Sequence, residues 1–136
     1  MSLSRLLLAE DHMETAKQLK ELLQSHFDVV ELVEDGRALV SAAARLTPDV
    51  IVTDISMPDL DGIEACLLIR GRDPRARIVL VTVHSEPILV ERGLAAGALG
   101  YVLKDAAGDE LVAAVQAALG DERYVSRALR PREDHA

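Results

Sequence analysis

Acidic residues directly follow two short apolar segments of this sequence. Glu10 and Asp11 come after the apolar run 6–9, and Asp54 comes after the run 50–53. Carboxylates that gather at one place repel one another unless they take up protons or share a cation. Oxygen ligands that leave room for water and a phosphate suit Mg²⁺. The pattern therefore predicts a magnesium-binding acidic cluster, provided that the fold brings these segment ends together.

A hydroxyl and an amine are placed in the same way. Thr82 lies near the end of the apolar run 78–83, and Lys104 follows the run 101–103. A lysine near carboxylates can pair with one of them at rest and with a phosphoryl oxygen when one is present, and a threonine can donate to that oxygen. A carboxylate nucleophile, a metal, an amine and a hydroxyl are the groups that phosphoryl transfer requires. The sequence therefore predicts a site suited to phosphoryl transfer.

Five short runs rich in branched aliphatic residues are predicted to form the strands that position these groups. The runs are 6–9, 29–33, 50–53, 78–83 and 101–103. Most are continuously apolar, as in strands that are covered on both faces. Segments with helical spacing separate them, and the clearest of these is the stripe Leu111, Val115, Ala118 and Leu119. Strand and helix alternating five times predict a doubly wound α/β fold with a parallel sheet. In such a fold the binding crevice lies at the carboxyl ends of the strands.

Composition excludes several classes of function. The chain has 136 residues, which argues for one domain, and its net charge of −8 opposes direct binding to nucleic-acid phosphates. Aromatic residues make up only 2% of the chain, so it offers no platform on which bases could stack. The single cysteine, Cys66, excludes an internal disulfide and is expected to be a buried, inert thiol. With no membrane-length apolar run and no cleavable signal pattern, a cytoplasmic protein that does not enter membranes is expected.

Two longer segments resemble the receiver domains of two-component response regulators. The run DISMPDLDG at 54–62 resembles their phosphoacceptor segment, and GALGYVLK at 97–104 resembles their fifth strand. With Glu10-Asp11 and Thr82, the resemblance covers the chain from about Leu6 to Leu119. It implies a flavodoxin-like receiver fold, in which a five-stranded parallel sheet of order 2-1-3-4-5 is combined with five helices.

The resemblance implies roles for the acidic residues. Asp54 corresponds to the aspartate that accepts a phosphoryl group from a sensor histidine kinase. The expected Mg²⁺ ligands are Asp11, Glu10 acting through water, Asp54 itself and the backbone carbonyl of Ser56. The chain is thus expected to accept a phosphoryl group and to assist its own phosphorylation and dephosphorylation, without turning over a separate substrate.

Further site residues follow from the same resemblance. Lys104 corresponds to the lysine that pairs with the phosphate, and Thr82 and Tyr101 correspond to the switch residues. A new dianionic group is expected to draw Thr82 inward, to let Tyr101 turn into the vacated space, and to reshape the surface formed by the fourth helix, the fifth strand and the fifth helix. A homodimer formed on phosphorylation stays an open alternative.

Three residues beside the site are predicted to modulate it. Val83 stands where a small alanine is typical, and its side chain is expected to narrow access to Asp54. Ser56 and His84 occupy the two positions that tend to tune the attack of water on the acyl phosphate.

The C-terminal part resembles one branch of the family. The Lys104-Asp105 junction and Tyr124-Val125-Ser126 resemble the NarL/FixJ (LuxR-type) branch, whose members usually carry a C-terminal helix-turn-helix. We therefore expect a receiver domain over 1–120, and over 121–136 an extension or a linker stub toward such a domain. In this interpretation DNA would be bound only through that absent domain, as part of transcription regulation.

Other interpretations stay open. A receiver-like module could bind partners without being phosphorylated. A haloacid-dehalogenase-like phosphatase also uses an aspartate nucleophile, but it usually carries a second aspartate two residues later, where this chain has Ser56. A flavin- or nucleotide-binding domain needs a glycine- or hydroxyl-rich loop after the first strand, and Glu10-Asp11 stand there instead.

Overall fold

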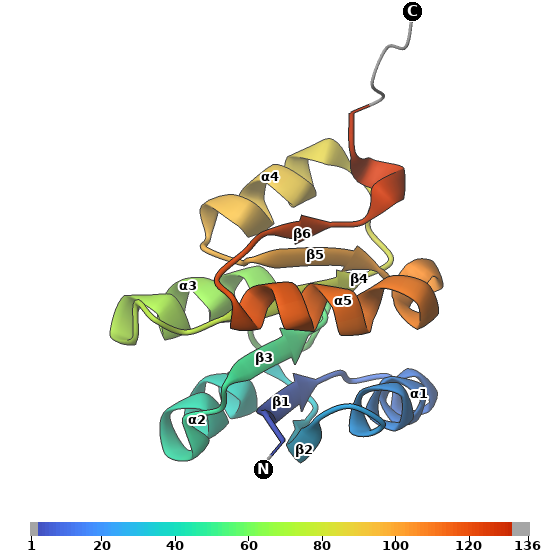
Figure 1. Ribbon diagram of the computed structural model, residues 1–136. Coiled ribbons are helices and arrows are strands. Elements are labelled where there is room, and N and C mark those ends of the chain that lie inside the picture. Colours follow the sequence, from blue (N-terminus) through green and yellow to red (C-terminus); the bar gives the residue numbers. More distant parts are fainter. Residues whose placement is uncertain (1–2, 132–136) are drawn as a thin grey trace, which may run out of the picture.

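A single parallel sheet forms the middle layer of the computed structural model, which describes residues 3–131 (Figure 1). The strands are β1 (Arg5–Ala9), β2 (Asp28–Val33), β3 (Val50–Thr53), β4 (Ile78–Thr82), β5 (Gly100–Leu103) and β6 (Tyr124–Val125). Their order across the sheet is β2-β1-β3-β4-β5-β6, and every neighbouring pair is parallel. The predicted doubly wound fold with strand order 2-1-3-4-5 is confirmed, and a short sixth strand extends it.

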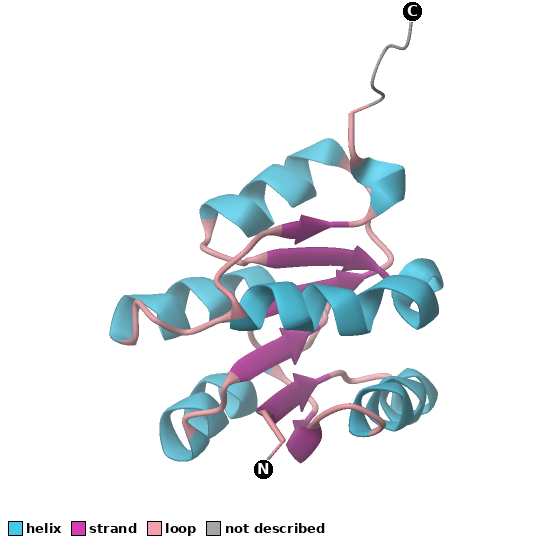
Figure 2. Ribbon diagram, viewed as in Figure 1, coloured by secondary structure: helices cyan, strands magenta, loops and turns pink. Residues whose placement is uncertain are grey.

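Five α-helices cover the two faces of the sheet (Figure 2). They are α1 (Met13–Gln24), α2 (Gly36–Leu46), α3 (Gly62–Arg72), α4 (Pro87–Ala95) and α5 (Ala107–Leu119). Two short 3₁₀ turns, Lys104–Ala106 and Arg127–Leu129, follow β5 and β6. Within residues 3–131, no helix combines the length and the apolar character needed to cross a membrane.

Successive residues of the strands point to opposite faces and divide the core into two clusters. Leu6 and Leu8 of β1 pack with residues of α1 and α5, whereas Leu7 and Ala9 pack with residues of α2, α3 and α4. Both faces are therefore buried, which explains why the strand sequences are continuously apolar. The clusters are almost entirely aliphatic because the chain has one Phe, two Tyr and no Trp.

Two predictions about core residues are confirmed, one for a helical stripe and one for the cysteine. Leu111, Val115 and Ala118 of the predicted helical stripe are buried in α5. Cys66 on α3 is also fully buried, and desolvation raises the pKa of its thiol to about 11. A thiol that keeps its proton is a weak nucleophile, as expected for a structural cysteine.

The start of α3 is fixed directly against the end of β3. Asp61 caps the helix by accepting a hydrogen bond from the Glu64 backbone N–H, and the Glu64 carboxylate accepts one in return from the Asp61 N–H. Gly62, the first residue of α3, lies so close to Asp54 that a Cβ atom there would be 2.0 Å from the Asp54 carbonyl oxygen. This close approach explains the glycine and holds the segment after β3 in place.

The sixth strand differs from the predicted surface extension. The chain turns back after α5, with Asp121 in the left-handed region at φ 58°, and Tyr124 and Val125 then pair with Gly100 and Tyr101 of β5. A strand of two residues is too short to show an alternating pattern, so periodicity could not reveal it. Residues 132–136 of the predicted extension lie outside the described part of the chain.

We expect Leu111→Ala to lower the free energy of unfolding by about 2–5 kcal/mol, because it removes a fully buried side chain and leaves a cavity beneath α5. Urea denaturation followed by circular dichroism would measure the loss. The matched control is Leu67→Ala on α3, whose side chain is 55% exposed and whose replacement should cost less than about 0.5 kcal/mol. Equal losses in the two variants would contradict the assignment of α5 to the core.

Candidate functional site

Three carboxylates meet at the carboxyl ends of β1 and β3. The two strands are neighbours, with Ala9 beside Thr53, so the residues that follow them emerge side by side. One carboxylate oxygen from each of Glu10, Asp11 and Asp54 lies within 4.8 Å of the others. Glu10 and Asp54 are buried, whereas Asp11 is exposed. The structure therefore brings together the acidic residues that the sequence placed at two strand ends.

Lys104 lies between the two buried carboxylates. Its Nζ is 2.7 Å from Glu10 Oε1 and 2.9 Å from Asp54 Oδ2. Burial by itself lowers the pKa of Lys104, but the contacts with Glu10 and Asp54 outweigh burial and raise this pKa above its ordinary value. The amine is therefore a permanent positive charge, held within contact distance of the predicted nucleophile.

Glu10 lies in an environment that disfavours its charged form. Burial raises its pKa, and the charge of Asp54 adds to that effect, while Lys104 and the His12 backbone N–H offset only part of it. Its Oε2 accepts the His12 N–H at 3.1 Å. Its Oε1 is buried and, apart from the ion pair with Lys104, has no well-directed hydrogen bond among the described residues.

The donor set fits a divalent cation. The cluster holds three carboxylates and one ammonium group, which contacts two of them, so it carries an uncompensated negative charge when all three are ionised. All the side-chain ligands are oxygens, one buried oxygen is poorly satisfied, and the exposed Asp11 leaves the cluster open to solvent. Such an open, all-oxygen site suits Mg²⁺, which keeps several waters. Glu10, Asp11 and Asp54 are the side chains that would hold it.

Asp54 is oriented by its backbone neighbours. Its Oδ1 accepts hydrogen bonds from the N–H groups of Ile55, at 2.7 Å, and of Ser56, at 3.4 Å. Its other oxygen faces Lys104. The Ser56 carbonyl belongs to this same loop, and its role as a metal ligand stays a prediction.

The predicted switch residues are joined through the backbone of His84. The His84 N–H donates to Thr82 Oγ1 at 3.1 Å, and the Tyr101 hydroxyl donates to the His84 carbonyl at 2.7 Å. The Tyr101 ring is fully buried, so it already occupies the inward position. Sequence reasoning could not find these links because they use main-chain atoms, which any residue at position 84 would supply.

The three predicted modulators are exposed or partly exposed. The His84 ring also contacts Ser56, with 2.7 Å between Nε2 and the Ser56 Oγ, so two of the modulators touch each other. Val83 exposes 69% of its surface. Their effect on the phosphoryl lifetime stays a prediction.

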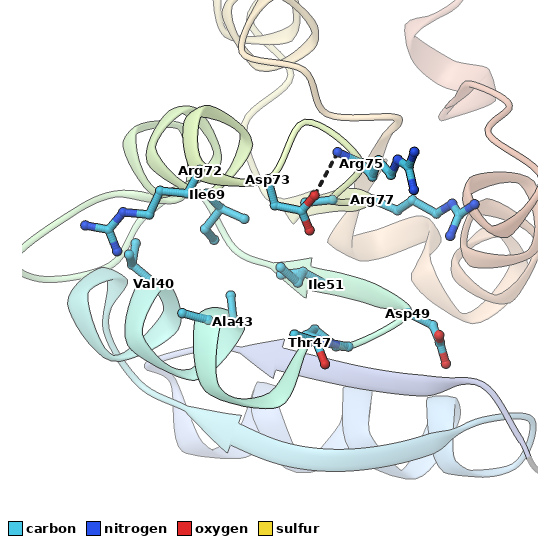
Figure 3. Close-up of a pocket in the computed structure, with 13 residues that line it drawn as sticks. Val40, Ala43, Thr47, Asp49, Ile51, Ile69, Arg72, Asp73, Arg75 and Arg77 are labelled. Atoms are coloured by element: carbon cyan, nitrogen blue, oxygen red, sulfur yellow. Dashed lines mark hydrogen bonds between the residues drawn. The ribbon is translucent and has the colours of Figure 1, made fainter.

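A pocket of about 410 Å³ lies elsewhere, between α2 and the end of α3 (Figure 3). Val40, Ala43, Ile51 and Ile69 contribute its apolar surface, and Arg72 is among the residues at its edge. None of the predicted site residues lines it. The chemistry predicted from the sequence therefore belongs to the acidic cluster and not to this pocket.

Comparisons with known proteins agree on one family. Residues 6–116 match the model of the response regulator receiver domain. The transcriptional regulatory protein MctR of Rhizobium johnstonii is 32% identical over 124 residues, which cover 90% of this chain and 58% of that protein. A LuxR-family two-component response regulator from Aurantimonas sp. SI85-9A1 superposes with a TM-score of 0.90 at 32% identity, covering 94% of this chain and 93% of that one.

A third match is the RcsB response regulator in complex with DNA, with a TM-score of 0.85 at 26% identity. It covers 94% of this chain and 66% of that one. The chain thus spans a little more than half of MctR and about two thirds of RcsB.

We expect Tyr101 to ionise late in an alkaline titration. Burial, followed by the charges of Glu86 and Asp54, raises its pKa from 10.0 to about 12. The folded state therefore holds this proton more tightly than the unfolded state does. The resulting stabilisation is present below pH 10 and is lost as the pH rises toward 12.

Phenolate absorbance of the folded protein would measure this step. Tyr101→Phe should remove the step near pH 12, whereas Tyr124→Phe should retain it. Ionisation near pH 10 in Tyr124→Phe, whose remaining tyrosine is Tyr101, would contradict the burial of this hydroxyl.

Proposed function

The chain belongs to the response regulator receiver domain family, and from that membership we propose that it is a phosphoacceptor of a two-component system, with Asp54 as the phosphorylated residue. Its relatives include transcriptional regulators and LuxR-family structures, which confirms the predicted family and its NarL/FixJ (LuxR-type) branch. The observation that carries the proposal is the position of Lys104, whose amine lies 2.9 Å from Asp54 Oδ2 and 2.7 Å from Glu10 Oε1.

In the proposed transfer, an oxygen of Asp54 attacks the phosphorus of a phosphohistidine on the sensor kinase. A new O–P bond forms, the P–N bond breaks, and the nitrogen of the leaving imidazole keeps the electron pair and takes up a proton. The Ile55 N–H, at 2.7 Å from Oδ1, keeps the carboxylate in one orientation during the attack. The amine of Lys104 then pairs with a phosphoryl oxygen in place of Asp54. Its positive charge thereby stabilises the negative charge of the phosphoryl group.

A bound Mg²⁺ would neutralise the phosphoryl oxygens and so reduce repulsion from the carboxylates. Glu10, Asp11 and Asp54 would supply side-chain ligands, and the Ser56 backbone carbonyl would complete the set. Glu10, Asp11 and the Ser56 carbonyl would only hold the ion, whereas Asp54 would both hold it and act as the nucleophile.

We further propose that phosphorylation is read through Thr82 and Tyr101. A phosphoryl oxygen on Asp54 would attract the Thr82 hydroxyl, whose oxygen now accepts the His84 N–H. Because the Tyr101 hydroxyl donates to the His84 carbonyl, a shift of this loop would alter both hydrogen bonds. The surface of α4, β5 and α5 would then change shape, and a kinase or a second copy of the chain could read that change.

The biological setting follows from the same family. We propose a cytoplasmic regulator that receives its signal from a sensor histidine kinase and binds DNA only through a further domain. In this proposal the chain turns over no separate substrate. The phosphatase alternative is disfavoured because Ser56, which stands in place of the second acid, is engaged with the His84 ring.

Incubation with Mg²⁺ and acetyl phosphate should add one phosphoryl group to the intact chain, detected by mass spectrometry. Asp54→Asn should gain none, because an amide cannot act as the nucleophile. The control Asp59→Asn, at a nearby loop aspartate outside the cluster, should be phosphorylated like the wild type. A chain that gains no phosphoryl group would support the binding-module alternative, and rapid turnover of a generic phosphate ester would support the phosphatase.

Asp11→Asn should weaken Mg²⁺ binding by roughly tenfold or more, because it removes one charged ligand from the cluster. Isothermal titration calorimetry on the unphosphorylated protein would measure the affinity, with Asp59→Asn again as the control. Equal Mg²⁺ affinities in Asp11→Asn and the wild type would contradict the proposed metal ligands while leaving Asp54 as a phosphoacceptor.

A further inference from the structure

The outer edge of β5 is covered by a segment of the chain itself. Residues 124–129, which we call the strap, comprise β6 and the 3₁₀ turn after it, and Figure 1 shows β6 beside β5 at the edge of the sheet. The Tyr124 N–H donates to the Leu99 carbonyl and the Ser126 N–H to the Tyr101 carbonyl, both at 2.9 Å. The strap therefore continues the parallel ladder on the strand that carries the predicted switch residue.

A side chain closes this ladder where the strap leaves the sheet. The Leu103 N–H donates to the hydroxyl oxygen of Ser126 at 2.9 Å, and Ser126 is fully buried. Leu103 immediately precedes Lys104, so the strap is bonded to the backbone one residue from the amine that contacts Asp54. A loss of this hydrogen bond would leave a buried N–H without a partner, which is costly.

A buried carboxylate on α5 anchors the strap from the other side. Glu110 is only 5% exposed, and its Oε1 accepts the Tyr124 hydroxyl at 2.9 Å and the Arg127 N–H at 3.1 Å. Both donors belong to the strap. Arg130 adds to this contact, with its guanidinium 5.1 Å from the centre of the Tyr124 ring. A charged group is retained in such a buried position only when it is well paired, and here the strap supplies the partners.

The strap and the acidic cluster therefore share β5. From Asp54 the contacts run through Lys104 to the Leu103 N–H and Ser126, while the Tyr101 backbone is bonded to the strap and the Tyr101 hydroxyl to His84. A movement of Lys104 or Tyr101 on phosphorylation would therefore change the geometry of the hydrogen bonds that hold the strap. Coupling of this kind acts equally in both directions.

We propose that the edge of β5 is a docking surface for the strap, held by Glu110 and Ser126, and that its occupancy is coupled to phosphorylation of Asp54. This inference rests on the proposed function. Ser126 is thus a positioning residue: it acts on Lys104 through the Leu103 backbone and touches no reacting atom. Because the strap leads directly into the chain beyond residue 131, its docking would transmit the state of Asp54 to whatever follows.

The forward test is hydrogen–deuterium exchange of the full chain, with and without Mg²⁺ and beryllium fluoride as a phosphoryl mimic. Binding of the mimic should slow the exchange of the strap amides, above all those of Ser126 and Arg127, by about fivefold or more. Unchanged exchange in the strap, with the mimic bound at Asp54, would overturn this inference alone. Failure of both the mimic and acetyl phosphate to react at Asp54 would overturn the proposed function and this inference with it.

The reverse test uses Ser126→Ala, which removes the acceptor for Leu103, and Ser126→Thr, which keeps a hydroxyl. We expect Ser126→Ala to weaken the binding of beryllium fluoride in the presence of Mg²⁺ about fivefold, and Ser126→Thr to restore most of the affinity. Ser25→Ala at the end of α1 is the matched control, and it should leave the affinity unchanged.

All affinities are measured where urea denaturation shows each variant to be fully folded, so that a loss of stability alone cannot change them. A Ser126→Ala affinity equal to that of the wild type would overturn the coupling.

Discussion

The contact of one ammonium group with two buried carboxylates is the constraint on which the site depends. Lys104 Nζ lies within 2.9 Å of both Glu10 and Asp54, and removing one partner of a buried ion pair leaves an uncompensated charge, which is strongly destabilising. The lysine leaves β5 while the acids leave β1 and β3, so the contact also fixes the ends of three strands relative to one another. The arrangement is incomplete as it stands, because a single positive charge does not balance three carboxylates. Such a site can bind a divalent cation. It can also accept a group that adds negative charge, because Lys104 can move from Asp54 to pair with that group.

The parallel sheet provides this geometry because all its strands end at the same edge. Burial on both faces leaves the polar residues of the site at the carboxyl ends of β1, β3, β4 and β5, and the fold therefore collects these ends in one place. The close approach of Gly62 to the Asp54 carbonyl then holds the loop after β3, so that the carboxylate is presented from a fixed backbone. The stability of the core and the precision of the site have the same physical origin.

Much of this could be predicted from the sequence, because the strands and the acidic cluster come from strong local patterns. The run 50–53 coincides with β3, and the types of residue that follow each run were sufficient to place Glu10, Asp54 and Lys104 together. The sixth strand was missed because a strand of two residues is too short to show an alternating pattern of apolar and polar residues. The roles of His84 and Ser126 as hydrogen-bond partners were also missed, since one acts through its main chain and the other accepts from a main-chain N–H. Contacts of this type depend on tertiary placement and leave no signature in composition or spacing.

The strap also changes what the sheet offers to other molecules. A bare β5 would present a row of unpaired amides and carbonyls along a buried, apolar strand, which is a template for sheet growth from one molecule to the next. With β6 in place, the outermost strand on that side is only two residues long, too short to recruit another strand effectively. On the opposite side the border is formed by β2, whose Glu31 is paired with Arg45 at 2.7 Å and places charge along that margin. The sheet is thus terminated at both sides, and fibre-like stacking of neighbouring molecules is disfavoured for as long as the C-terminal segment stays in place.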